Sequence, residues 1–163
     1  QISLEGKRIW IIGMAPLGMR RTLMAKFLFS TAVSMSVTMA LVGASCAMLS
    51  IPLERILYFT LTVGVMAFTL NALAVGLGAV YPNFREDNPS KIVSGFGGTL
   101  CLVLSFLYII GMLSLMAATS RWAFGGSSSV IFGLGWALFL GGSFLLGWLP
   151  LRTGIRKMAS LEI

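Results

Sequence analysis

The chain has 163 residues, of which 57% are hydrophobic and only 10% are charged, and its mean hydropathy is +0.93. Because a soluble domain carries about 25% charged residues, this composition indicates a membrane protein with one compact bundle and no separate catalytic domain. The net charge of +7 does not indicate nucleic-acid binding. The basic residues lie between hydrophobic runs, where membrane topology and anionic lipid explain them.

The first 25 residues are polar and basic at both ends and apolar in the middle. On a helix, Trp10 and its apolar neighbours form one broad surface, and Glu5 and Arg8 lie beside it. Pro16 cannot continue that helix without losing a hydrogen bond. We therefore expect a short amphipathic helix at the membrane surface, followed by an elbow. An interfacial anchor that only sets the orientation of the chain is the alternative interpretation.

Four hydrophobic runs without charged residues follow this segment. Each run exceeds the roughly 20 residues that a helix needs to cross a bilayer, and backbone groups in lipid must be satisfied within their own segment. The expected spans are about 27–49, 56–79, 94–117 and 128–149, followed by a tail over 150–163. The sequence thus predicts a single transmembrane domain: an all-α polytopic membrane protein with four transmembrane helices in two hairpins plus an N-terminal interfacial amphipathic helix.

The distribution of Lys and Arg predicts the orientation. With four spans, the amino end, the middle loop and the carboxy end share one side, which carries ten of the twelve basic residues. The opposite side carries only Arg55 and Arg121. Because basic residues concentrate in cytoplasmic loops, we expect both ends of the chain in the cytoplasm, with the bundle in a bacterial plasma membrane.

The sequence offers little for enzymatic chemistry. It contains no His, and its five acidic residues lie outside the expected spans. The glycine-rich run 95–98 lacks the Lys-Ser/Thr and the preceding strand of a phosphate-binding loop. We expect no enzymatic activity, no bound metal and no cofactor on this chain.

Polar and small residues within the spans are candidates for a substrate path or for helix packing. Asn71, with Thr69 nearby, either lines a path or forms a hydrogen bond to a neighbouring helix. Small residues spaced by four permit close backbone approach, within the chain or across a dimer seam. These pairs are Ala72 with Gly76, Ala74 with Gly78, Ser94 with Gly98, and Ser143 with Gly147.

Two segments, which together cover about a quarter of the chain, carry a resemblance to a known family. The first is Ser3-Leu4-Glu5-Gly6 with Trp10, Pro16 and Lys26; the second runs from Tyr81 through Lys91 to Gly98. Both resemble segments of the permease subunits of ABC exporters with the type-2 architecture. Since the chain begins at Gln1 without a Met or a signal-peptide pattern, we expect it to be the carboxy-terminal part of such a protein.

The resemblance implies a permease that moves an unidentified substrate by means of a separate ATPase subunit, which would hold ATP and Mg. It also implies a second permease half, in a homodimer or heterodimer. The implied ATPase contact, a cytoplasmic coupling segment, comprises Ser3, Leu4, Glu5, Gly6, Arg8, Trp10 and Pro16. The implied cytoplasmic loop comprises Tyr81, Pro82, Asn83, Arg85, Glu86, Asn88, Pro89 and Lys91. A membrane scaffold or assembly protein and a secondary carrier are the alternatives.

Overall fold

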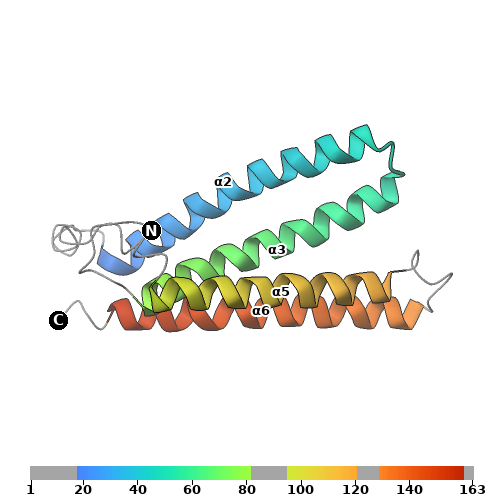
Figure 1. The fold of residues 1–163 in the computed structure, drawn as a ribbon. Helices are drawn as coiled ribbons and strands as arrows, with labels where there is room; N and C mark the ends of the chain where they lie inside the picture. The colour runs from blue at the N-terminus through green and yellow to red at the C-terminus, as the bar shows by residue number, and fades with distance from the viewer. Residues whose placement is uncertain (1–17, 82–94, 121–128, 160–163) are drawn as a thin grey trace.

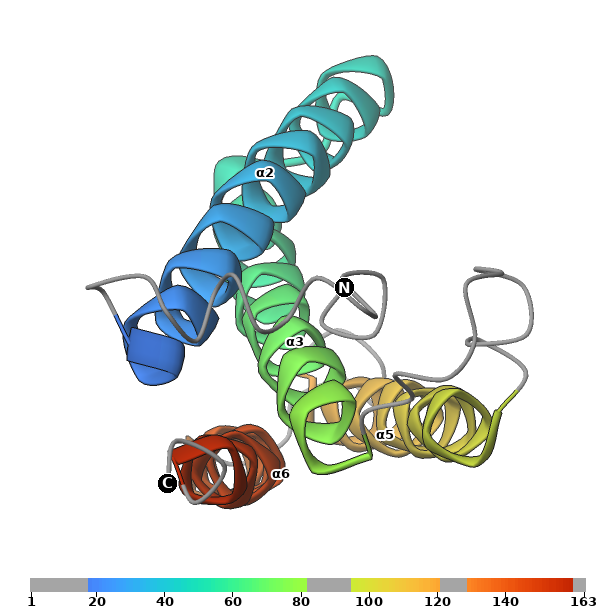
Figure 2. The same cartoon turned by 90° about the vertical axis from the view of Figure 1, so that its left-hand side faces the viewer.

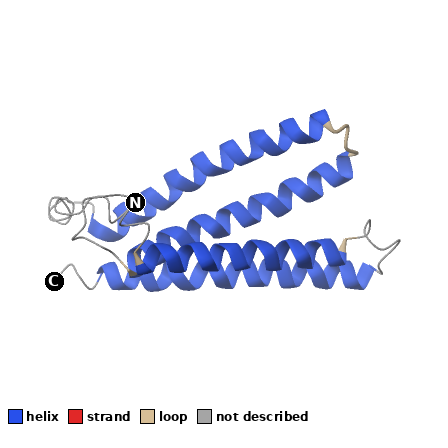
Figure 3. Cartoon of the chain, in the orientation of Figure 1, coloured by secondary structure: helices blue, strands red, loops and turns tan. Residues whose placement is uncertain are grey.

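A computed structural model describes residues 18–81, 95–120 and 129–159, which form helices without any strand (Figures 1 and 3). The helices are α2 (Gly18–Met48), α3 (Leu53–Val80), α5 (Phe96–Thr119) and α6 (Ser129–Ala159). All four are long and apolar enough to cross a membrane. The predicted all-α membrane bundle of two hairpins is therefore confirmed. The amphipathic helix expected before α2 lies outside the described residues.

Helix α3 is the centre of the bundle. It contacts α2, α5 and α6, and its most extensive contact is with α6 (Figure 2). Half of an 18-residue hydrophobic stretch within α3 is buried, compared with 11% of the corresponding stretch in α2 and in α5. The other three helices leave many large apolar side chains exposed, as contact with lipid requires.

The buried side chains form two clusters. One joins α2, α3 and α6 and consists of Leu23, Phe27, Ala72, Val75 and Ala79, with Leu151 and Ile155 packed against it. The other joins α3, α5 and α6 around Met66, Tyr108, Met116 and Phe139. The long α3–α6 contact thus belongs to both clusters.

The turn between α2 and α3 is a Schellman motif. Ser50 has a φ of 50°, the backbone N–H of Ile51 donates to the carbonyl of Cys46 at 3.4 Å, and that of Ser50 donates to Ala47. This pattern satisfies carbonyls that a helix end leaves unpaired, which matters most where water is scarce. The first of the two predicted hairpins is thereby built with only four residues between the helices.

Helix α6 continues ten residues beyond the expected end of the last span at 149. Pro150 lies inside it and lacks the N–H that would bond to the carbonyl of Leu146. The segment stays helical because its residues beyond the proline, including Gly154 and Ile155, pack against the other helices. The region predicted as a tail over 150–163 is therefore helical as far as Ala159.

The two hairpins approach at one end of the bundle and diverge at the other. Figure 1 shows the junction end, where α3 ends and α5 begins, and the far end, where α2 leans away from α5 and α6. At the far end Tyr58 reaches across: its hydroxyl donates to the carbonyl of Met116 at 3.0 Å, and its ring packs edge-on against Trp136. A pocket of about 440 Å³ beside Tyr58 separates α3 from α5 there.

Candidate functional site

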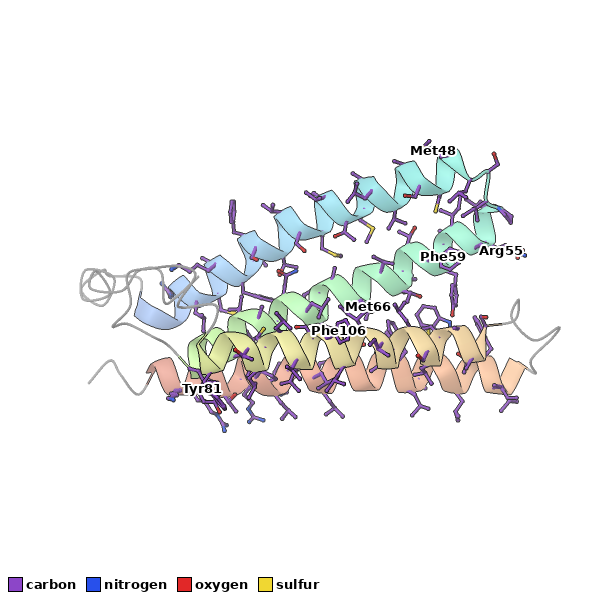
Figure 4. All side chains as sticks on the ribbon, in the orientation of Figure 1. Met48, Arg55, Phe59, Met66, Tyr81 and Phe106 are labelled. Atoms are coloured by element: carbon purple, nitrogen blue, oxygen red, sulfur yellow. The ribbon has the colours of Figure 1, made fainter. Side chains whose placement is uncertain are left out.

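Most residues that the resemblance singles out lie outside the described residues. The coupling segment from Ser3 to Pro16 and the loop residues from Pro82 to Lys91 belong to this part of the chain. Tyr81 is the one residue of the implied coupling segment and cytoplasmic loop that the structure describes. Figure 4 shows it at the junction end of α3, opposite Met48 and Arg55 at the far end. The candidate site therefore consists of Tyr81, where the predicted loop begins, and the described residues around it.

Tyr81 is the meeting point of three helix ends. Its ring packs edge-on against Phe96 of α5, with the ring centroids 5.4 Å apart. The ammonium of Lys157 on α6 lies 5.8 Å from the same ring, within the range of a cation–π contact. A Cβ on Gly97 would lie 2.8 Å from the Cβ of Tyr81, so the start of α5 fits closely against this residue. We call Val80, Tyr81, Phe96, Gly97 and Lys157 the junction cluster.

Lys157 also fixes the end of α3 directly. Its Nζ donates a hydrogen bond of 2.6 Å to the carbonyl of Val80, the last residue of α3. The carbonyls of a final helical turn have no partner within the helix, and they carry the negative end of the helix dipole. A cation at this position stabilises the end of α3 and ties it to α6. The loop that follows Tyr81 thus starts from a point attached to α5 and α6.

Next to the junction cluster, α3 and α6 pack backbone against backbone. A Cβ on Gly76 would coincide with the backbone of Pro150 and Leu151, and one on Gly154 would lie 2.8 Å from both the Gly76 carbonyl oxygen and the Ala79 Cβ. Ala72 lies one turn before Gly76 in α3, and a Cβ on Gly147 of α6 would lie 3.3 Å from the Ala72 Cβ. Glycine is required here because the helices approach more closely than any side chain permits. We call this contact the α3–α6 joint.

The structure separates the predicted small-residue pairs. The pair Ala72 with Gly76, and Gly147 of the pair Ser143 with Gly147, lie in the α3–α6 joint. At Gly78 a Cβ would meet no heavy atom of the described residues within 4 Å, so these residues show no close approach there. Gly78 faces away from α6, two residues along the helix from Gly76. Gly98 is half-buried near the start of α5, one residue after the glycine that contacts Tyr81.

Asn71 connects α3 to α2. Its side-chain amide donates to the Ser34 hydroxyl at 2.8 Å and to the Ala67 carbonyl, and its Oδ1 accepts from the Ser30 hydroxyl at 3.0 Å. Both the NH₂ and the oxygen of the side-chain amide therefore have partners. Of the two roles that the sequence left open for Asn71, a substrate path or a hydrogen bond to a neighbouring helix, these contacts correspond to the second. Thr69 is buried and donates to the carbonyl of Val65.

The sequence indicates Ser143 only as a small residue paired with Gly147, and it does not single out the other residues that hold the remaining helix contacts. Tyr108 and Ser143 share a buried hydrogen bond of 2.8 Å between α5 and α6. Tyr58, Gly154 and Lys157 were likewise not identified. A tyrosine hydroxyl within an apolar run must find a partner, so Tyr58 and Tyr108 carried a usable signal. Gly154 follows Gly147 by seven residues, a spacing that places both glycines on the same face of a helix.

The described residues provide no chemistry for metal binding. Within residues 18–81, 95–120 and 129–159 no group of three His, Cys, Asp or Glu side chains could hold an ion. Glu54 is the one carboxylate in these ranges, and it lies at the far end. What this part of the molecule offers at the junction end is a set of contacts that join the end of α3 to α5 and α6.

Comparison with known proteins adds the family. Residues 1–163 match the family described as "Putative ATP-binding cassette". The chain belongs to this family. This ATP-binding cassette family member is an integral membrane protein associated with ABC transporters, in agreement with the wider group that the sequence suggested. The family description names the cassette and no permease, so the match does not extend to the permease role. Neither the curated proteins nor the solved structures include a significant match to the chain.

Proposed function

We propose that the chain is the membrane-spanning permease part of an ATP-driven exporter, with ATP hydrolysis on a separate subunit. The family and the four spans support an ABC membrane component. The printed sequence contains no G-x-x-x-x-G-K-[ST] phosphate loop, so the segment in hand suits the membrane part rather than the nucleotide-binding part.

The junction cluster is the observation that carries the proposal. A permease must convert movement of its cytoplasmic segments into movement of its spans, and this needs an element with two arrangements. Tyr81 starts the predicted cytoplasmic loop and contacts both α5 and α6. The α3–α6 joint beside it is closely packed, whereas the far end of α2 leans away from α5 and α6 (Figure 1). A push on the loop would therefore rotate the helices about the joint and change the opening at the far end.

The proposed role requires the junction end to face the cytoplasm, where the ATPase would bind. With Cys46 and Cys101 replaced by Ala, we expect Cys at Ser90 or Ser160 to be shielded from an impermeant thiol reagent in intact cells. Cys at Ser127 should react. Permeabilised cells, in which all three positions should react, provide the control. Reaction at Ser90 from outside would reverse the orientation and remove the loop from the ATPase.

Co-purification from native membranes tests the function itself. The full-length protein carrying an affinity tag should recover an ATPase subunit in mild detergent, and ATP hydrolysis should be present in the recovered material. Recovery of the full-length protein in good yield with no ATPase would contradict the permease proposal and favour a scaffold without transport activity.

A further inference from the structure

The longest contact in the bundle, between α3 and α6, leaves an apolar groove on one side. Its volume is about 360 Å³, which lies in the range of ligand pockets. Thr69 and Ala72 form part of the floor, and Phe144, Trp148 and Leu151 of α6 form the wall. Phe68 closes the edge towards α2, where its ring packs against Phe27 at 5.5 Å.

The groove is open to the bilayer and has no unsatisfied polar group to offer a ligand. Phe68, Phe144 and Trp148 are 50%, 63% and 47% exposed. Phe144 and Trp148 stack at an interplanar angle of 15° and give the wall a flat surface. The hydroxyls of Thr69 and Ser143, which also line the groove, already bond to Val65 and Tyr108. A flexible apolar chain is therefore the chemistry that fits.

The wall of the groove leads into positive charge. Phe144, Trp148 and Arg152 are spaced by four residues, so they follow one another along the same ridge of α6. Arg152 and Arg156 are exposed, one and two turns beyond the aromatic wall. Side chains on a helix lean towards its N-terminus, which brings the Arg152 guanidinium towards Trp148. Within residues 18–81, 95–120 and 129–159 no carboxylate lies near this charge, since Glu54, the one acid in these ranges, lies at the far end.

We propose that this groove binds one acyl chain of an anionic phospholipid, whose phosphate Arg152 holds. The groove is too small for a transmembrane helix, which is about 10 Å across, so a second copy of the chain or a partner helix fits it less well than a single acyl chain. The guanidinium suits a phosphate because its donors can contact two oxygens at once. The site is independent of the proposed transport role.

The headgroup part of the site is tested with two lipids that have the same acyl chains. Native mass spectrometry of the purified protein should show dioleoyl phosphatidylglycerol bound about fivefold more tightly than dioleoyl phosphatidylcholine, the gain expected from one basic residue near an anionic lipid. Arg152→Gln should abolish this preference. Arg55→Gln, which removes the same charge at the far end, should retain it. Equal binding of the two lipids by the wild-type protein would overturn the proposal.

The acyl-chain part is tested by filling the groove. Leu140 lines it, whereas Leu145 is exposed on α6 outside it. Leu140→Trp should weaken the binding of both lipids about tenfold, because the larger ring occupies space that the chain needs. Leu145→Trp should leave binding unchanged. If the two substitutions weakened lipid binding equally, or if the wild-type dimer lost the lipid that the monomer binds, the lipid would belong to another surface and the proposal would be overturned.

Discussion

Gly76→Ala should lower the free energy of unfolding by about 2 kcal/mol, although alanine is the better helix former. The added methyl group would overlap the backbone of Pro150 and Leu151, and these atoms cannot move without separating α3 from α6. Overpacking against backbone is more costly than overpacking against the end of a flexible side chain. Reversible unfolding of the purified protein in mixed detergent micelles measures this change.

Gly78→Ala is the matched control. It lies two residues away in the same helix, and its added methyl group would meet no heavy atom of the described part of the chain within 4 Å. We expect this substitution to be neutral or to stabilise the protein by up to about 1 kcal/mol, since it only removes the backbone freedom of glycine. Gly76→Ala is thus expected to lower the free energy of unfolding, whereas Gly78→Ala is not. A similar result for both would show that α3 and α6 are further apart than the structure places them.

The spans could be predicted because their physical cause is local. Runs without charge that exceed the thickness of the bilayer must be helical in lipid, whatever surrounds them. How far α6 continues is not a local property, because a proline inside a helix removes one hydrogen bond, yet α6 passes Pro150 and reaches Ala159. Contacts made by Gly154 and Ile155 outweigh the hydrogen bond that Pro150 removes, and no local pattern around residue 150 contains that information.

The close contacts were only half predictable. Spacing by four identified Gly76 and Gly78 equally, but the two residues point about 200° apart on a helix, so at most one can face α6. The choice between them depends on the rotation of α3, which the burial of Leu73 and Ala79 fixes and the sequence alone does not. Lys157 was interpreted as a topology signal only. Its bond to Val80 spans 77 positions and depends on how α6 lies against α3.

Trp10→Ala should greatly reduce recovery of the ATPase subunit while leaving insertion of the four spans intact. Trp10 lies outside the described residues, and the prediction follows from the sequence and the proposed function. It is the largest apolar side chain of the segment Ser3–Pro16, and buried aromatic anchors often account for 2 kcal/mol or more of a small interface. That loss corresponds to a roughly 30-fold weaker complex. Quantifying the co-purified ATPase and its hydrolysis of ATP measures the effect.

The charged neighbours of Trp10 supply the control. Glu5→Ala and Arg8→Ala should reduce recovery much less, because charges at the rim of an interface act mainly on the rate of association. An anchor that only binds the membrane surface predicts a different pattern. In that case Trp10→Ala would release the segment from the membrane without loss of any protein partner. Measuring ATPase recovery and protease accessibility of the segment on the same three variants separates the two roles, and unchanged recovery with Trp10→Ala would remove this segment from the ATPase contact.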